Sequence, residues 1–129
     1  SLEALDDDVV LVLERDGVEG ATAQIKRVYR VDLNDFADRG FLRIRLVCDL
    51  LAFDDPNGIT SAEDGAVGRG RAFAFPFVTP ECLAIIDYRT LLVANDNNYP
   101  MSVGRRPPHT PDDNEFILVR LPRSLADGD

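Results

Sequence analysis

Short runs of alternating apolar and polar residues, separated by turns rich in Asp, Gly and Pro, constrain the fold of this chain most. Residues 42–50 place apolar side chains at every second position, with Arg and Asp between them, which is the period of a half-buried β-strand. Residues 9–13 are a continuous aliphatic run, too short for an ordinary helix. The pattern predicts an all-β chain with strands at 2–5, 9–13, 23–33, 42–50, 82–86, 91–94 and 116–121.

The predicted strands fall into two groups within one domain. The expected parts are a four-stranded unit (1–50), a connector (51–80), a three-stranded unit (81–121) and an acidic tail (122–129). Turn chemistry at residues 54–58 marks the connector. Phe73, Phe75 and Phe77 alternate near its end, so we expect the connector to pack onto the sheets.

An internal repeat links the two groups of strands. Residues 5–14 align with residues 86–95 at a constant offset of 81, and each copy has an apolar residue, an Asp-led turn, a hydrophobic strand and a polar cluster. Glu3 and Glu81 precede the two copies. Hairpins repeated at long spacing are typical of a radial array such as a β-propeller, although any two hairpins share part of this pattern.

The number of predicted strands indicates an incomplete propeller. A propeller blade has four strands, so residues 1–50 make one blade and residues 81–121 make three strands of a closing blade. The prediction is a partial β-propeller of about two blades of antiparallel four-stranded sheets. Open blade edges would then be exposed. We therefore expect a partner, either the missing N-terminal blades of a longer propeller, of which this chain would be a fragment, or a second copy of the chain.

Composition narrows the possible partners. The chain has 129 residues, with 23 acidic against 14 basic side chains and a net charge of −9, which repels nucleic acid. The acidic excess can gather cations or simply keep the chain soluble. No apolar run is long enough to span a membrane. Cys48 and Cys82 have no metal-ligand spacing; two buried free thiols are expected, with one disulfide as the alternative.

Several segments resemble one protein family, and the Ala94–Pro100 and Pro111–Phe116 strings are the most specific of them. The full set of similar segments is 2–5, 11–16, 28–33, 75–81, 90–100 and 111–118. Together they resemble the C-terminal part of the bacterial "esterase-like activity of phytase" family. The resemblance implies an exported β-propeller, secreted or periplasmic, and a hydrolase-like activity related to that of calcium-dependent phytases.

The candidate catalytic residues are Glu3, Glu81 and Arg15. If the propeller interpretation holds, Glu3 and Glu81 begin the innermost strands of their blades and face each other across the central channel. Arg15 could hold a phosphate or carboxylate of an anionic small-molecule substrate. The alternative is a structural ion-pair network formed by Glu3, Glu14 and Arg15.

The candidate metal ligands are Glu3, Glu14, Glu81, Asp96 and Asn97. Calcium prefers hard oxygen ligands of this kind, and it could polarise a bound phosphate for attack by water. Asp96 and Asn97 could equally form a turn, since Asp and Asn bond to their own backbone. Neither acidic loop has the spacing of an EF-hand.

Other kinds of chemistry have little support. The chain has no nucleophile-elbow motif, and its single histidine, His109, is expected on the surface. Arg105 and Arg106 could meet an anionic ligand, but a solvated loop is the expected setting. The predicted function is a calcium-dependent hydrolase of phosphoric or carboxylic esters at the propeller centre. The alternative is a non-catalytic propeller that serves as a binding module.

Overall fold

The computed structural model describes residues 1–128. Its strands are β1 (Leu2–Ala4), β2 (Val9–Arg15), β3 (Lys26–Phe36), β4 (Leu42–Asp49), β5 (Phe53–Asp54), β6 (Ala72–Phe73), β7 (Thr79–Asp87), β8 (Thr90–Asp96) and β9 (Phe116–Arg120). Two one-turn 3-10 helices, η1 (Gly20–Thr22) and η2 (Asp38–Gly40), complete the regular structure of this part of the chain. No helix among residues 1–128 has the length and apolar character to cross a membrane.

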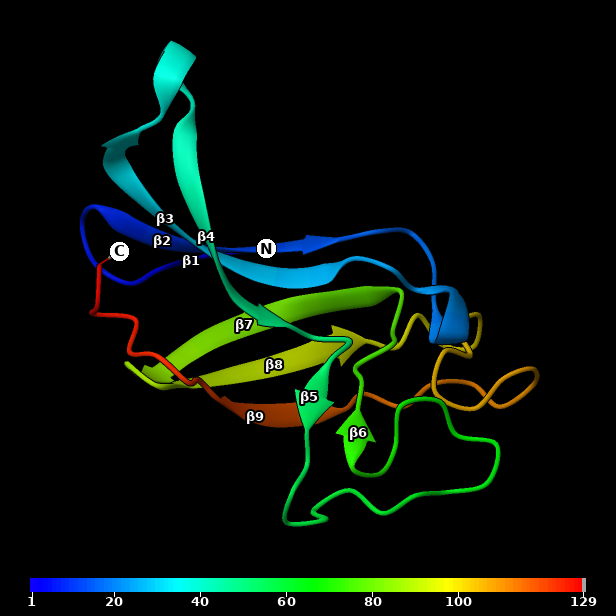
Figure 1. Ribbon diagram of the computed structural model, residues 1–129. Helices are drawn as coiled ribbons and strands as arrows, with labels where there is room; N and C mark the ends of the chain where they lie inside the picture. Colours follow the sequence, from blue (N-terminus) through cyan, green and yellow to red (C-terminus); the bar gives the residue numbers. More distant parts are fainter. Residues whose placement is uncertain (129) are drawn as a thin grey trace.

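The strands form two antiparallel sheets and a small hairpin. The N-terminal sheet has the order β1-β2-β3-β4, and the C-terminal sheet has the order β7-β8-β9. β5 and β6 pair only with each other. Figure 1 shows the two sheets stacked on one another, with the far half of the β3–β4 hairpin extending beyond the stack. The all-β prediction is confirmed, and the stacked, unclosed sheets make the fold a partial β-propeller.

The first hairpin of each sheet closes with the same turn. In the N-terminal sheet, Asp6 Oδ1 accepts hydrogen bonds from the backbone N–H groups of Asp8 and Val9, at 2.9 and 2.8 Å. In the C-terminal sheet, Asp87 Oδ1 accepts one from the N–H of Arg89, at 2.8 Å. An Asp side chain that bonds to the backbone two residues later fixes a tight turn. Asp6 and Asp87 are 81 residues apart, so the sequence repeat corresponds to a repeated structure.

The core lies between the two stacked sheets. It contains buried aliphatic side chains from both sheets, such as Leu11 and Val28 from one and Leu91 and Val93 from the other. Each fully buried side chain of this size contributes about 1.5–3 kcal/mol to folding. The hydrophobic runs of β2 and β8 are thus explained by burial of one of their two faces in this core.

The connector closes one side of the core, as expected. Phe73, Phe75 and Phe77 are all buried, and the rings of Phe75 and Phe77 meet edge to face with centroids 4.7 Å apart. The backbone N–H of Phe75 donates to the carbonyl of Leu50 at 2.7 Å, which ties the connector to the end of β4. The connector also contains the β5–β6 hairpin, which the sequence pattern did not predict.

The C-terminal segment returns to the core, so the acidic tail does contribute to the fold. Leu125 is fully buried, and its N–H donates to the carbonyl of Tyr88 in the β7–β8 turn at 2.7 Å. Arg30 of β3 donates from Nε to the carbonyl of Leu125 at 3.0 Å. One short segment therefore bonds to both sheets.

The two cysteines are free, in agreement with the sequence interpretation, but only one is shielded. Cys48 is half-buried and packs against the core, whereas Cys82 is exposed. The expectation that both are buried is wrong for Cys82, because this residue points out of the C-terminal sheet on the side opposite Leu83, which is a core residue.

Candidate functional site

The two glutamates predicted to be catalytic lie on strands that touch. Glu3 is on β1 and Glu81 is on β7, the first strands of the two sheets, and β1 contacts β7. Glu3 is half-buried and pairs with Leu11, a core residue, so it shares the face that packs onto the C-terminal sheet. Glu81 is exposed. The structure thus places both carboxylates on edge strands of the two sheets that contact each other.

Glu81 occupies a β-bulge. Pro80 pairs with Asn95 and Cys82 pairs with Ala94, so Glu81 is an extra residue without a partner on β8. A bulge redirects the side chains around it, and bulges are common beside active sites. The register also shows that Glu81 is not the exact counterpart of Glu3: Glu3 pairs with Leu11, and Ala84 pairs with Leu92, the residue 81 positions after Leu11, so Glu81 lies three residues before the equivalent position.

Arg15 and Glu14 lie at the end of β2 and are exposed. Arg15 donates from Nη1 to the carbonyl of Asp16 at 3.5 Å, a weak contact that leaves the guanidinium open to a ligand. Among residues 1–128, no ion pair joins Glu3, Glu14 and Arg15, so the alternative of a structural network is not supported within this part of the chain.

Asp96 and Asn97 form a turn at the end of β8. Asp96 Oδ1 accepts from the N–H of Asn98 at 2.9 Å, and Asn97 Oδ1 accepts from the N–H of Tyr99 at 3.2 Å. Asn98 has a positive φ of 48°, and its amide donates to Thr79 Oγ1 at 2.7 Å. These contacts support the turn interpretation of the segment, which Asp and Asn suit because they tolerate left-handed geometry.

The predicted calcium site has not been located in the structure. Within the described residues, no group of three or more His, Cys, Asp or Glu side chains is placed to hold a metal ion. Calcium takes roughly 6–8 oxygen ligands, which can also come from Asn side chains and backbone carbonyls. Calcium binding therefore stays a prediction.

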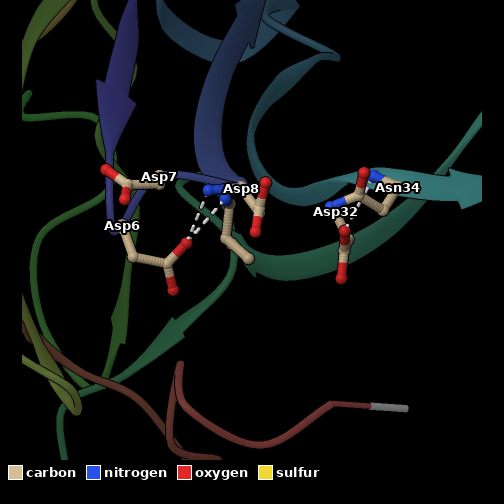
Figure 2. Close-up of a pocket in the computed structure, with 6 residues that line it drawn as sticks. Asp6, Asp7, Asp8, Asp32 and Asn34 are labelled. Atoms are coloured by element: carbon tan, nitrogen blue, oxygen red, sulfur yellow. Dashed lines mark hydrogen bonds between the residues drawn. The ribbon is translucent and has the colours of Figure 1, made fainter.

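An acidic hollow lies at the β1–β2 turn. It has a volume of about 440 Å³ and is lined by Asp6, Asp7, Asp8, Val9, Asp32 and Asn34. Figure 2 shows the Asp6 carboxylate turned back to its own turn, and Asp32 Oδ1 likewise accepts from the N–H of Asn34 at 2.9 Å. These two carboxylates stabilise local backbone, so their positions have a structural explanation.

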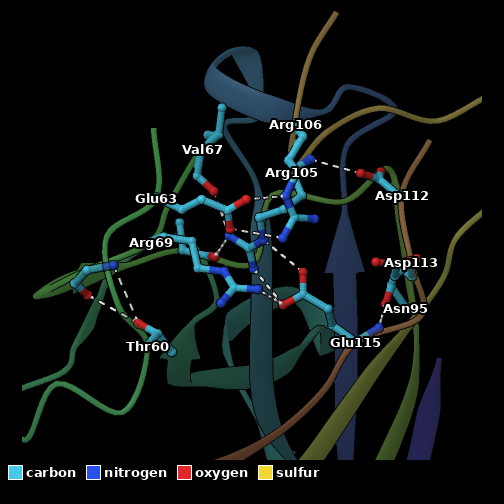
Figure 3. Close-up of polar contacts among 12 residues, drawn as sticks. Thr60, Glu63, Val67, Arg69, Asn95, Arg105, Arg106, Asp112, Asp113 and Glu115 are labelled. Atoms are coloured by element: carbon cyan, nitrogen blue, oxygen red, sulfur yellow. Dashed lines mark hydrogen bonds and ion pairs between the residues drawn. The ribbon is translucent and has the colours of Figure 1, made fainter. Parts of the chain in front are cut away.

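Sequence reasoning missed a buried arginine cluster on the other side of the molecule (Figure 3). Arg105 is only 1% exposed and forms a bidentate ion pair with Glu115, in which Nε–Oε2 is 2.8 Å and Nη2–Oε1 is 3.1 Å. Its guanidinium lies 5.1 Å from the ring centroids of Phe73 and Phe77. The expectation of a solvated Arg105 is wrong, because these partners replace its water.

The loop that carries Arg105 is held by backbone contacts. Asp112, which is 2% exposed, accepts from the N–H groups of Gly104 and Arg105 at 2.9 Å each. Gly104 lies so close to the connector that a Cβ there would be 2.7 Å from the carbonyl oxygen of Pro76. The signal for this arrangement was the Pro111–Phe116 string, which holds both acidic partners.

Arg106 pairs with Glu63 at the edge of the same cluster. The two side chains form two hydrogen bonds of 2.7 and 3.0 Å, and both are partly exposed. The bond from Arg106 lowers the pKa of the Glu63 carboxyl, and Glu63 in turn raises the pKa of Arg106. This pair closes the 61–70 loop over Arg105, so the cluster is internal rather than a free anion site.

A groove of about 610 Å³ runs beside the free edge of β9. It is lined by Phe53, Asp54, Asp55, Pro56, Asn57, Ile59, Thr60, Arg69, Phe73, Glu115, Phe116, Ile117, Leu118, Val119 and Arg120. Asp55 takes bonds from Thr60, which lower the pKa of the Asp55 carboxyl. Arg69 has a buried Nε without a hydrogen-bond partner, and its Nη2 lies 3.8 Å from Glu115 Oε1.

Comparison with known proteins gives one match. A model of the phytase-like family, described as esterase-like activity of phytase, matches residues 1–99, which include β1 to β8 and end before the Arg105 loop. No curated protein and no solved structure matches the chain significantly. Because the matched region includes about three quarters of the sequence, the chain belongs to the phytase-like family named for the esterase-like activity of phytase.

Proposed function

We propose that the protein hydrolyses phosphoric or carboxylic esters, with Glu3 and Glu81 on the inner strands as its acid and base. Membership of the phytase-like family supports a hydrolase. The observation that carries the residue assignment is the contact between β1 and β7, which brings these two strands to one inner edge of the stack. Paired carboxylates suit hydrolysis, because one can accept a proton while the other donates one.

The chain's own side chains suffice for a balanced reaction. One glutamate, as carboxylate, takes a proton from water while the water oxygen bonds to phosphorus or to the carbonyl carbon. The bond to the alcohol oxygen breaks, and the other glutamate, as carboxylic acid, gives its proton to that oxygen. Arg15 stabilises the negative charge on the remaining ester oxygens.

The test is an ester panel with matched carboxylate variants. Inositol phosphates, nitrophenyl phosphate and short nitrophenyl carboxylates are assayed with and without added calcium. We expect Glu3→Gln and Glu81→Gln to lower kcat on the accepted ester by about 10²-fold or more, which is typical for loss of a positioned acid or base. Asp38→Asn, which removes an exposed carboxylate in η2, is the control and should keep full activity.

Two outcomes would contradict the proposal. If no ester is turned over with or without calcium, a hydrolase is excluded. If Glu81→Gln keeps wild-type kcat, the inner-strand assignment is wrong. The first result favours the second candidate, a non-catalytic binding module, which draws support from the use of Asp96 and Asn97 in a turn rather than in an open site.

A further inference from the structure

Both sheets have a second apolar face on the side away from the core, and its side chains are at least partly exposed except Val31 and Ala94, which are 6% and 3% exposed. Each sheet has a packed face toward the core and a free face on its other side. On the N-terminal sheet, two cross-strand rows make up the free face: Leu2, Val12, Tyr29 and Leu46, and Ala4, Val10, Val31 and Ile44. On the C-terminal sheet, the rows are Cys82, Ala94 and Phe116, and Ala84, Leu92 and Leu118.

The apolar side chains of each free face form a continuous surface rather than isolated exposed positions. Every member of the four rows is apolar, apart from the hydroxyl of Tyr29, and the rows lie side by side on their sheets. Leu118 is 69% exposed and Leu46 is 51% exposed. Contiguous exposed apolar surface of this kind marks an interaction site.

The internal repeat shows which surface each free face fits. At the offset of 81, Leu11 on the packed face of the N-terminal sheet aligns with Leu92 on the free face of the C-terminal sheet. Val12, on the free face of the first sheet, aligns with Val93, on the packed face of the second. Repeated positions therefore face the same direction through the stack.

This relationship distinguishes a head-to-tail stack from a sandwich with two-fold symmetry. In a symmetric sandwich, repeated positions of both sheets would point into the shared core. Here the packed face of the N-terminal sheet corresponds, through the repeat, to the free face of the C-terminal sheet. The free face of the C-terminal sheet should therefore bind a surface like the packed face of that same sheet. The surface that corresponds to it is the free face of the N-terminal sheet.

We propose that the chain self-associates head to tail, with the free face of the C-terminal sheet of one copy packed on the free face of the N-terminal sheet of the next. The interface inside each chain is the template for the interface between copies. Heterologous contacts of this type close into a ring. With two sheets in each copy and about four to eight blades in a propeller, roughly two to four copies close it.

Charges at one end of the stack favour this arrangement. The β1–β2 turn carries three exposed carboxylates, Asp6, Asp7 and Asp8, while the same end of the C-terminal sheet carries exposed Arg89 and Arg120. Figure 1 shows the β1–β2 and β7–β8 turns at the same end of the two sheets. Head-to-tail packing places the basic end of one copy beside the acidic end of the next, which attracts them.

The test measures the mass of the purified chain in solution by light scattering. Wild type should have at least twice the monomer mass of 14.3 kDa. Leu118→Glu and Leu46→Glu each place a charge on one free face, at positions exposed in a single copy, and each should be a monomer. Met101→Glu, whose side chain is 80% exposed in the loop after β8 and belongs to neither face, is the control and should assemble like wild type.

The equimolar mixture of the two variants gives the sharpest result. Each keeps the face that the other lacks, so the mixture should form dimers that grow no further. A monomeric wild type overturns the proposal and leaves the free faces to other blades of a propeller. Dissociation by Leu118→Glu without any effect of Leu46→Glu also overturns it, because it shows symmetric pairing. Circular dichroism checks the fold, and Leu118→Ser and Leu46→Ser replace any variant that unfolds.

Discussion

Arg105 and Glu115 form a bidentate ion pair in which the cation is almost completely enclosed by protein. Arg105 is 1% exposed, Glu115 accepts from two of its nitrogens, and the carbonyls of Val67 and Ala74 accept from a third. A buried cation tolerates the loss of its partner poorly, because the charge remains without compensation. Arg105 thereby joins its own loop to two parts of the connector, at Val67 and Ala74, and to the segment that leads into β9.

Glu115→Gln should therefore lower the free energy of unfolding by about 3–5 kcal/mol, since it leaves the Arg105 charge buried. The matched control is Glu63→Gln, which breaks the partly exposed pair with Arg106 and should cost much less, because water screens that pair. Urea denaturation followed by circular dichroism measures both. Equal losses for the two variants would show that burial does not distinguish the pairs.

The Lys26–Asp16 ion pair should make the free energy of unfolding depend on pH in the acidic range. Burial raises the pKa of Asp16, but the bond from the Lys26 ammonium at 2.7 Å and the N–H groups of Gln24 and Ile25 outweigh it, so its pKa is well below the usual value. A depressed folded pKa gives stability that is present above the unfolded pKa of about 3.9 and is lost as the pH falls toward the folded pKa.

Comparison of wild type with Asp16→Asn tests this dependence. The difference in free energy of unfolding should be constant from about pH 5 to 7 and should shrink as the pH falls below about 4. Asp38→Asn, which removes an exposed carboxylate outside this pair, is measured alongside as the control. A difference between wild type and Asp16→Asn that grows with acid would contradict the assignment.

The two thiols should differ in reactivity. Burial raises the pKa of Cys48 to about 12, and the neighbouring Asp49 adds to the shift, so little thiolate forms. Cys82 is exposed on the free face of the C-terminal sheet. In monomeric Leu118→Glu, an aromatic disulfide reagent should modify one thiol quickly, and Cys82→Ser should remove that phase. Two fast thiols in the folded protein would exclude the burial of Cys48.

Gly104→Ala should destabilise the Arg105 loop. The added Cβ would meet the Pro76 carbonyl at 2.7 Å, and since the neighbour is backbone, the loop must move. Overpacking of this kind costs about 1–3 kcal/mol. Gly17→Ala is the control, because its Cβ would meet nothing within 4 Å. Thermal unfolding of both variants checks the difference, and equal melting temperatures would contradict it.

The sequence predicted the strands well, because their information is local. Alternation in residues 42–50 and the aliphatic run of residues 9–13 depend on neighbouring side chains only, and β4 and β2 lie at these places. The strand boundaries differ by up to a few residues: β7 begins at Thr79 rather than at residue 82, since pairing with Asp96 extends it through the bulge.

What the sequence could not provide was the pairing of distant polar groups. Arg105 looked like part of a solvated loop, because its partners at Val67, Phe73 and Glu115 are brought together only by the folded connector. The β5–β6 hairpin has two residues in each strand and leaves no period to detect. For the candidate site, the sequence placed Glu3 and Glu81 on the first strands of the two groups, where β1 and β7 lie, but it did not predict the bulge at Glu81, three residues before the counterpart of Glu3.

The position of Leu125 has a consequence for how the molecule opens. Its side chain is enclosed between the sheets, and its backbone is bonded to Tyr88 on one and to Arg30 on the other. The segment around Leu125 thus connects the two sheets, and the sheets cannot separate unless this segment leaves the core. Separation of the two layers and detachment of the chain's end should accordingly be a single event, with the same free energy at amides in both layers during hydrogen exchange.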